Sequence, residues 1–400
     1  MSKKNSLPKS VYFLLVGQAI NLTTAVLSVT VAPIVGANLT SKSGYATIPY
    51  GLQFFAILIS TLFFSKLMNT YGRYRVFLGG VLSLFFSGAL GFISISTSNF
   101  ILLCVSQFLL GLFISTANFY RFAATDKLPT ELVAKASTMV ISGGVIAAII
   151  APMLAITLQQ VNGFPDYSLI YLSLSLLAFI LLIILICWQL TIRNGEFPPS
   201  VIIKNSNDSS DINKSINKSY IYIGILGGGV SYFLMNLMMI CSSLYLKTNH
   251  SFHYASFAIQ MHVLAMFLPS FFVSHLIKKL GSTTIVILGF VLIAISCLLP
   301  ILFNNHIFVN IALVILGVGW NFSYSGSTAL IGMLKGGNRN KVQGLNETSI
   351  ALFATLGAFL PATLIDFIGW SNVNLFSLLL SLVLIISLYL LSRNNNYLEE

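Results

Sequence analysis

Hydrophobic residues run along this chain in long, nearly continuous stretches that short polar segments separate. Each stretch holds about 20 residues or more, which is the length of an α-helix that crosses the hydrocarbon core of a membrane. The sequence therefore predicts a membrane protein with twelve spanning helices. Their expected ranges are 11–36, 46–66, 76–96, 100–121, 137–159, 167–190, 220–246, 254–276, 283–303, 307–331, 343–365 and 371–391.

A polar segment at 191–219 separates the first six stretches from the last six. It is rich in Asn, Ser and Lys and has no hydrophobic periodicity, which predicts a flexible cytoplasmic linker. The predicted domains are thus an N-terminal six-helix bundle at 1–190 and a C-terminal six-helix bundle at 220–400.

The two halves also share a short pattern, which follows the second stretch of each half. It runs Ser65-x-Leu67-x4-Gly72 in the first half and Ser274-x-Leu276-x4-Gly281 in the second. Two similar bundles around a central cavity are typical of transporters that are built from repeats.

Positive charge is distributed unevenly over the polar segments. Only Lys42 and Lys247 fall in the loops of one side, whereas the other 19 of the 21 Lys and Arg residues share the opposite side and the termini. Loops rich in Lys and Arg stay in the cytoplasm during membrane insertion. We therefore expect a multi-pass protein of the cytoplasmic (inner) membrane with both termini in the cytoplasm.

Composition supports a membrane protein and argues against a nucleic-acid binder. Hydrophobic residues make up 56% of the chain and charged residues 8%, against about one quarter charged residues in soluble domains. The formal net charge is +11, and the cations that produce it lie in the loops that an anionic inner leaflet would face. The expected partners are the lipid bilayer and a small-molecule solute, with no nucleic acid, and a monomer suffices for this architecture.

Neither metal chemistry nor enzyme catalysis is indicated. The four cysteines, Cys104, Cys187, Cys241 and Cys297, each lie inside a hydrophobic stretch at spacings that suit neither a metal site nor a disulfide framework. The sequence has no clustered His, Cys, Asp and Glu set and no Gly-rich phosphate loop. We expect no cofactor and no ATP coupling, so an ion gradient or the gradient of the solute would supply the energy.

The loop after the second stretch resembles a motif of the major facilitator superfamily. That family's pattern is Gly-x-Leu-x-Asp-Arg-x-Gly-Arg-Lys, and Leu67, Gly72 and Arg73 match it at the same spacing. Ser65 replaces the first glycine and Asn69 replaces the aspartate, so the charged latch of the family motif is altered. The resemblance covers the whole chain and implies an all-α membrane fold with two six-helix bundles. The gating loop that it implies consists of Ser65, Asn69, Gly72, Arg73, Arg75 and Asp126.

Two further family motifs are present in modified form. The fourth stretch carries Gln107-x-x-x-Gly111 where the family has Arg-x-x-x-Gly, and the fifth keeps only the proline, Pro152, of a glycine-rich antiporter motif. Small residues spaced four apart let helices approach closely. Gly143, Ala147, Ala151 and Pro152 therefore have two interpretations. They either pack as an ordinary helix face or form a hinge against the eighth stretch. Segments near His262 and Gly317 resemble an uncharacterised bacterial branch of the superfamily.

Polar side chains inside the spans are the expected site, because such groups are costly in the membrane unless they are paired or wetted. The resemblance implies that the first, fourth, seventh and tenth spans line the cavity. Amides, hydroxyls and aromatic rings suit a polar organic solute, although each of them could also tie helices together. The predicted substrate-binding residues are Gln18, Asn21, Asn118, Tyr120, Arg121, Tyr232, Asn236, Trp320, Asn321 and Tyr324.

Three titratable or charged side chains are further candidates, and two of them, Arg121 and His262, have two interpretations each. Arg121 either extends to lipid phosphate or Asp126, or binds a carboxylate or phosphate of the solute. His262 lies well inside its span and titrates near neutral pH, so it is a candidate for the coupling proton, as is Glu347. A neutral histidine bonded to a carbonyl is the alternative.

The function that these features favour is a secondary transporter of a small polar solute, neutral or anionic, that works by alternating access with proton coupling. The alternative is a multidrug efflux antiporter, which Pro152 and the Met-rich seventh span favour. A receptor or scaffold is disfavoured, since the longest loop is the 191–219 segment.

Overall fold

The computed structural model describes residues 7–126, 128, 130–193, 218–249, 251–303, 305–332 and 339–396. Within these ranges the chain forms helices and connecting turns without a strand, so the predicted all-α class is confirmed. Most of the linker predicted at 191–219 lies outside the described residues.

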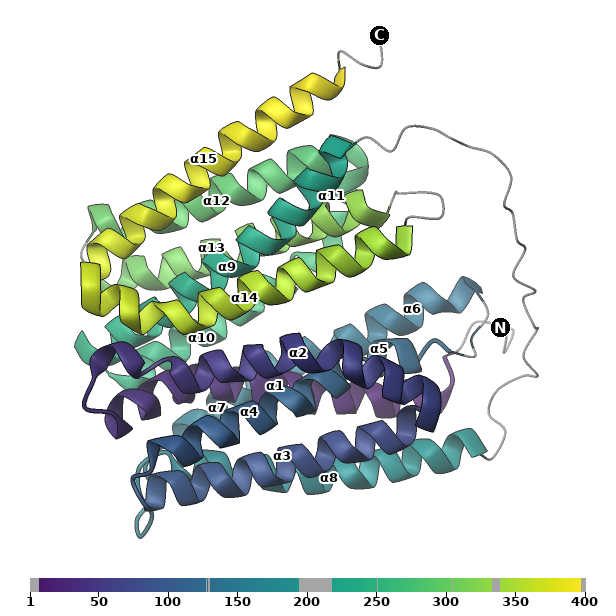
Figure 1. Cartoon of the computed structure of the whole chain (residues 1–400), viewed down its shortest axis with the longest axis vertical. Helices are drawn as coiled ribbons and strands as arrows, with labels where there is room; N and C mark the ends of the chain where they lie inside the picture. The colour runs from purple at the N-terminus through teal and green to yellow at the C-terminus, as the bar shows by residue number, and fades with distance from the viewer. Residues whose placement is uncertain are drawn as a thin grey trace. The chain divides into compact units, whose positions relative to one another are not determined.

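The helices follow the hydrophobic stretches in order (Figure 1). They are α1 (Lys9–Leu39), the 3-10 turn η2 (Ser43–Tyr45), α2 (Ile48–Tyr71), α3 (Arg73–Ser96), α4 (Phe100–Ala117), α5 (Tyr120–Ala123), α6 (Thr130–Ile141), α7 (Gly143–Leu158), α8 (Ser168–Arg193), α9 (Lys218–Asn249), α10 (Phe252–Phe267), α11 (Ser270–Leu280), α12 (Ser282–Leu302), α13 (His306–Gly332), α14 (Arg339–Ile368) and α15 (Trp370–Asn396).

Length and hydropathy agree with the predicted number of spans. In the described part of the chain, 11 helical segments are long and apolar enough to cross a membrane, and α10 with α11 forms a bent pair that makes up to 12. The bend of 46° lies at Leu268–Pro269, where proline cannot donate a backbone hydrogen bond to continue the helix. The chain is therefore a multi-pass membrane protein.

Contacts divide the chain into two compact units. The first comprises residues 1–28 and 59–213, and the second comprises residues 29–58 and 214–400. The C-terminal part of α1, η2 and the beginning of α2 thus group with the C-terminal helices, although the sequence assigned them to the N-terminal bundle. The boundaries at 190 and 220 stay a prediction.

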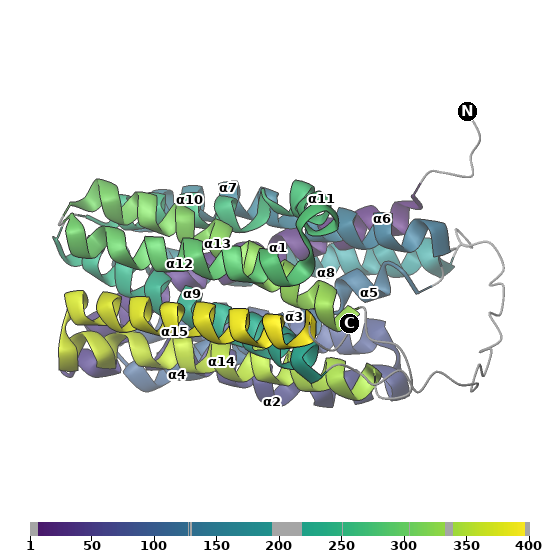
Figure 2. The ribbon, with the colours of Figure 1, turned by 90° about the horizontal axis from the view of Figure 1, so that it is seen from above.

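Each unit is organised around a helix that packs against two others. In the first unit α3 lies against both α4 and α8 (Figure 1), and in the second α12 lies against both α13 and α15 (Figure 2). These are the third, fourth and sixth spans and the ninth, tenth and twelfth spans. The same pairing in both units is the arrangement expected of a duplicated bundle.

The short pattern shared by the two halves also has the same backbone geometry. Gly72 precedes α3 with φ 81° and ψ 156°, and Gly281 precedes α12 with φ 84° and ψ 150°. Glycine adopts this region readily because it has no Cβ, whereas other residues are strained there. The repeated glycine therefore marks an equivalent sharp turn between consecutive spans.

Replacing Gly281 with alanine should lower the free energy of unfolding by about 1–3 kcal/mol, because the backbone must hold a strained φ. Steric overlap does not contribute, since nothing lies within 4 Å of a Cβ at this position. Unfolding of the purified protein in mixed micelles measures the change.

Gly79→Ala is the matched control, because Gly79 lies inside α3 with nothing within 4 Å of a Cβ. This variant should be as stable as the wild type or more stable by about 0.4–1 kcal/mol. Equal stability of Gly281→Ala and Gly79→Ala would contradict the role of the turn.

Candidate functional site

Polar side chains gather inside both units, and none of the buried residues that the structure describes is Asp, Glu, Lys or Arg. The described residues contain no group of three or more His, Cys, Asp or Glu side chains that could hold a metal ion. The interior is therefore polar through amides, hydroxyls and aromatic rings rather than through charge.

A buried amide connects three helices of the first unit. The Ser28 hydroxyl in α1 donates to Gln107 Oε1 in α4 at 2.7 Å, and Gln107 Nε2 donates to the Tyr171 hydroxyl in α8 at 3.1 Å. The Gln107 side chain is completely buried. Gln107 stands where the resembled family has arginine, so a neutral network replaces a cation at this position. The sequence did not place Gln107 among the site residues, although an amide in an apolar stretch was a usable signal.

The predicted pair in the first span lies together. Asn21 Nδ2 donates to Gln18 Oε1 at 3.4 Å, with Asn21 buried and Gln18 partly exposed. Asn21 Oδ1 is buried and has no hydrogen-bond partner in the described part of the chain. The pair therefore keeps one acceptor for water or a solute.

Residues around the break between α4 and α5 point in different directions. The Tyr120 side chain is completely buried, and its ring meets Phe77 edge to face with centroids 4.7 Å apart. Asn118 is exposed, and the Arg121 guanidinium lies 4.7 Å from the centre of the Phe122 ring. The structure therefore places Tyr120 in the packed interior of the first unit, away from Asn118.

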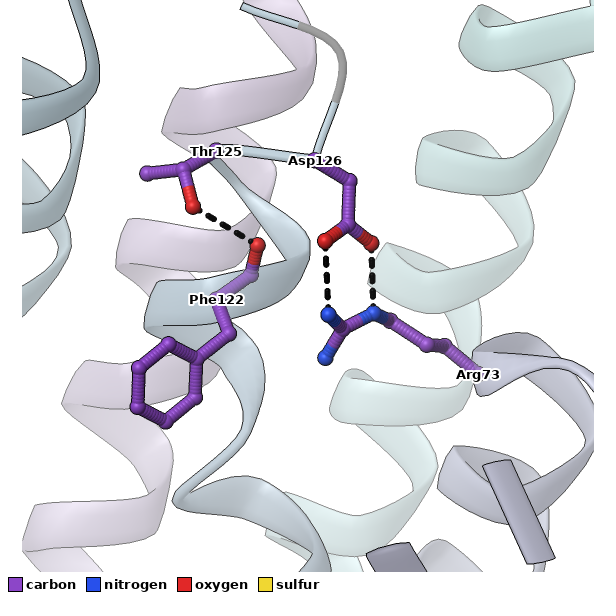
Figure 3. Close-up of polar contacts among 4 residues, drawn as sticks. All are labelled: Arg73, Phe122, Thr125 and Asp126. Atoms are coloured by element: carbon purple, nitrogen blue, oxygen red, sulfur yellow. Dashed lines mark hydrogen bonds and ion pairs between the residues drawn. The ribbon is translucent and has the colours of Figure 1, made fainter. Parts of the chain in front are cut away.

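Asp126 pairs with Arg73 at the loop that follows α2. Arg73 Nε lies 2.5 Å from Asp126 Oδ2, and a terminal guanidinium nitrogen donates to Oδ1 at 2.6 Å (Figure 3). Among the residues that the structure describes, this bidentate contact is the one ion pair. It ties the start of α3 to the end of α5, and it uses the carboxylate that one interpretation assigned to Arg121.

Part of the predicted gating loop lines a cavity beside that ion pair. Gly72, Arg73, Arg75 and Asp126 line a cavity of about 570 Å³ together with Trp188. The rest of the loop lies beyond it: Ser65 is partly exposed, and Asn69 is exposed.

Three aromatic rings meet in the second unit, and we call them the aromatic cluster: Tyr232 of α9 with Trp320 and Tyr324 of α13. Trp320 and Tyr324 stack with centroids 5.1 Å apart and planes 9° from parallel. Tyr232 stands edge-on to both, at 5.2 Å from Trp320 and 6.0 Å from Tyr324. The structure thus brings together three of the residues that the sequence predicted for substrate binding.

Two predicted amides tie helices together in the second unit. Asn236 Nδ2 of α9 donates to the Ala354 carbonyl of α14 at 3.0 Å. Asn321 Nδ2 of α13 donates to the Met266 carbonyl and to the Ser270 hydroxyl, both at 2.7 Å, at the break between α10 and α11. Asn321 therefore supplies a donor where Pro269 interrupts the helix.

The two coupling candidates lie in different surroundings. His262 is completely buried, and its Nδ1 lies 2.7 Å from the Leu313 carbonyl of α13. Because a carbonyl only accepts, Nδ1 carries a proton, and Nε2 has no partner among the described residues. Glu347 is exposed on α14.

The predicted hinge face of α7 packs within the first unit. Gly143, Ala147, Ala151 and Pro152 are all buried. A Cβ on Gly143 would lie 2.8 Å from the Ala19 nitrogen of α1, so glycine permits close approach of the two backbones. A hinge against the eighth span stays a prediction.

A second polar connection lies where η2 and Thr47, just before α2, meet α14 in the second unit. The Thr47 hydroxyl donates to the Phe359 carbonyl at 2.9 Å, and the Thr363 hydroxyl donates to the Gly44 carbonyl at 2.9 Å. The Ser43 hydroxyl donates to the Asp366 carboxylate. We call this set the η2–α14 contacts. More than 300 residues separate the partners, so no local sequence pattern indicated them.

An all-helical multi-pass protein with an uncharged polar interior has the construction of a solute carrier. The chain belongs to the Major Facilitator Superfamily, whose model matches residues 14–218 and 221–398.

The similarity to characterised and uncharacterised relatives extends along nearly the whole chain. The chain is 29% identical to the riboflavin transporter RfnT of Brucella anthropi over 94% of its own length and 93% of that protein. It is 26% identical to YddS of Bacillus subtilis, an uncharacterized MFS-type transporter, over 89% of this chain and 85% of that one.

Solved structures of transporters share the fold. The nucleoside transporter NupG superposes with a TM-score of 0.66 at 11% identity, covering 96% of this chain and 98% of that one. A bacterial homologue of the iron transporter ferroportin, in an inward-facing state, superposes with a TM-score of 0.64 at 14% identity, covering 96% and 99%.

The buried network of the first unit predicts a measurable coupling between Gln107 and Tyr171. Gln107→Leu should lower the free energy of unfolding by about 1–3 kcal/mol, and Tyr171→Phe by about 0.5–1.5 kcal/mol. The double variant should lose less than the sum by about 0.5–1.5 kcal/mol, because the shared hydrogen bond is counted twice.

Tyr12→Phe is the control partner for this cycle, since Tyr12 is an exposed residue of α1. Its effect should add to that of Gln107→Leu. Additive behaviour of Gln107 with Tyr171 would show that the hydrogen bond does not contribute.

Proposed function

We propose that the chain is a secondary transporter that carries riboflavin, or a similarly flat and uncharged solute, across the cytoplasmic membrane. The observation that carries this proposal is the similarity to RfnT, which extends along 94% of the chain and 93% of that protein. Similarity of both halves at once favours a shared solute class, because the cavity of such carriers is built from both repeats.

The uncharged interior supports a neutral solute. No Asp, Glu, Lys or Arg is buried in the described ranges, and Gln107 replaces a possible cation with an amide. Riboflavin is uncharged at neutral pH and carries carbonyls, ring nitrogens and hydroxyls. Amide and aromatic side chains bind such groups by hydrogen bonds and stacking without the cost of burying a charge.

Alternating access would use two sets of contacts. The Arg73–Asp126 ion pair in the first unit and two of the η2–α14 contacts in the second, Ser43 with Asp366 and Thr363 with Gly44, are polar and exposed, so they can break and form at small cost. We propose that the ion pair lies on the cytoplasmic side, where the Lys- and Arg-rich loops place it. The proposed working unit is a monomer with two six-helix bundles and both termini in the cytoplasm.

Proton coupling is proposed to act through His262. His262 is the one histidine that is buried in the described ranges, and its Nε2 atom is an acceptor without a hydrogen-bond partner there. Protonation at Nε2 would introduce a charge that the interior otherwise lacks, which is how a proton could change the relative stability of two states. Glu347 is the second candidate, at an exposed position of α14.

Cells that cannot make or import riboflavin should grow on low external riboflavin when they express this chain. Uptake of labelled riboflavin should be saturable and should be inhibited by unlabelled riboflavin, because one cavity binds both. Cells with the empty vector give the background.

The same cells separate the proposal from multidrug efflux. Protein that reaches the membrane without riboflavin uptake, and that confers resistance to several unrelated hydrophobic cations, would contradict the proposal and favour the exporter.

His262→Gln should retain exchange of riboflavin but lose its accumulation against a gradient, because glutamine keeps a polar amide and cannot take up the coupling proton. The ratio of internal to external riboflavin, measured with and without a proton gradient, distinguishes the two activities. Glu347→Gln, measured in parallel, tests the second candidate. Unchanged accumulation by His262→Gln would dismiss the histidine.

A further inference from the structure

Trp320 has a buried donor that the described protein does not satisfy. The side chain is 6% exposed, and its indole Nε1 has no hydrogen-bond partner in the described ranges. A buried N–H without an acceptor is unfavourable, and tryptophan in a core usually finds a partner for this group. An acceptor from outside the chain is therefore expected at this nitrogen.

The rings around Trp320 form a surface suited to a flat molecule. Trp320 and Tyr324 stack with ring planes 9° from parallel, and the Tyr232 ring stands at 86° to Trp320 and at 78° to Tyr324. Tyr232 and Tyr324 are partly exposed, whereas Trp320 is buried. Flat aromatic ligands gain from offset stacking and edge contacts with such rings.

The aromatic cluster faces other polar and aromatic groups of the second unit. Tyr232 lies within electrostatic range of the Tyr50 hydroxyl on α2. Tyr50 is buried, and its ring contacts Phe54 edge to face at 5.3 Å. Tyr232 therefore lies near Tyr50 of α2 within the same unit.

An aromatic cluster can also bind an organic cation through its ring faces. A quaternary ammonium has no acceptor, however, and would leave the Trp320 N–H unsatisfied. A neutral heterocycle with a carbonyl or an unprotonated ring nitrogen at its edge satisfies both the rings and the donor. The chemistry therefore favours the heterocycle.

We propose that the aromatic cluster of Tyr232, Trp320 and Tyr324 binds the flat heterocyclic ring of the solute, with the Trp320 N–H donating to a ring acceptor. This inference rests on the proposed function, since it assigns the ring-binding part of the same transport site. The polyol or other polar tail of the solute binds elsewhere in the cavity.

Flavin fluorescence tests this assignment with the full-length protein in detergent. Stacking on tryptophan or tyrosine quenches flavin emission, and excitation in the visible avoids light absorption by the protein. Riboflavin titrated into the wild type should therefore lose emission as it binds. Trp320→Ala should raise the Kd about 10- to 100-fold, the range expected for loss of one stacking partner.

Trp320→Phe keeps a ring in the core but lacks the N–H. It should fold as the wild type does and raise the Kd about 3- to 10-fold, as expected for one hydrogen bond. This variant keeps the test decisive if the alanine variant does not fold.

Trp370→Phe is the matched control. Trp370 stacks on Tyr245 with centroids 4.7 Å apart and planes 13° from parallel, so it is a second Trp–Tyr pair of the same unit. Its replacement should leave both the Kd and the quenching unchanged.

Three outcomes are distinguishable. Weaker binding in both Trp320 variants but not in Trp370→Phe supports the inference. Wild-type binding that Trp320→Ala and Trp320→Phe retain with full quenching overturns the inference and leaves the proposed function intact. Wild-type protein that neither binds nor transports riboflavin overturns the proposed function, and with it the ring site.

Discussion

Every polar group inside a membrane span must find a partner, because the hydrocarbon core offers no water to replace it. This constraint governs most of the polar contacts in both units. Gln107 is bonded to α1 and α8, Asn236 to α14, and Asn321 to the broken span formed by α10 and α11. These amides therefore hold neighbouring helices together, and some of the buried groups left without partners are the positions that we propose for the solute and the proton.

Buried polar side chains have two roles in this chain: some connect helices, and others keep a hydrogen-bonding atom free for a ligand. Asn236 and Asn321 donate to backbone carbonyls of neighbouring helices, so the structure uses them as connections. Trp320 Nε1, His262 Nε2 and Asn21 Oδ1 are buried without a partner among the described residues, as is the Oδ1 atom of Asn321. A transporter needs both kinds, since rigid bundles must present a site whose hydrogen bonds only the solute completes.

Hydrophobic stretches predicted the helices well because a spanning helix needs little beyond length and apolarity. The short pattern shared by the two halves suggested a duplication, and the structure gives both of its glycines, Gly72 and Gly281, a positive φ. Contacts between residues far apart in the sequence could not be predicted. Asp126 could pair with Arg73 or Arg121 on sequence grounds, and only packing places Arg73 beside it. The interior position of Tyr120 depends on Phe77, which lies 43 residues earlier in the chain.

Exchange across reconstituted vesicles tests the central claim most directly, because it requires both binding of a neutral flavin and movement of the site across the membrane. Vesicles containing the purified protein and loaded with unlabelled riboflavin should take up labelled riboflavin faster than empty vesicles do. An internal cationic dye should give no such acceleration. Equal rates with and without internal riboflavin, from protein shown to be folded and inserted, would contradict the account.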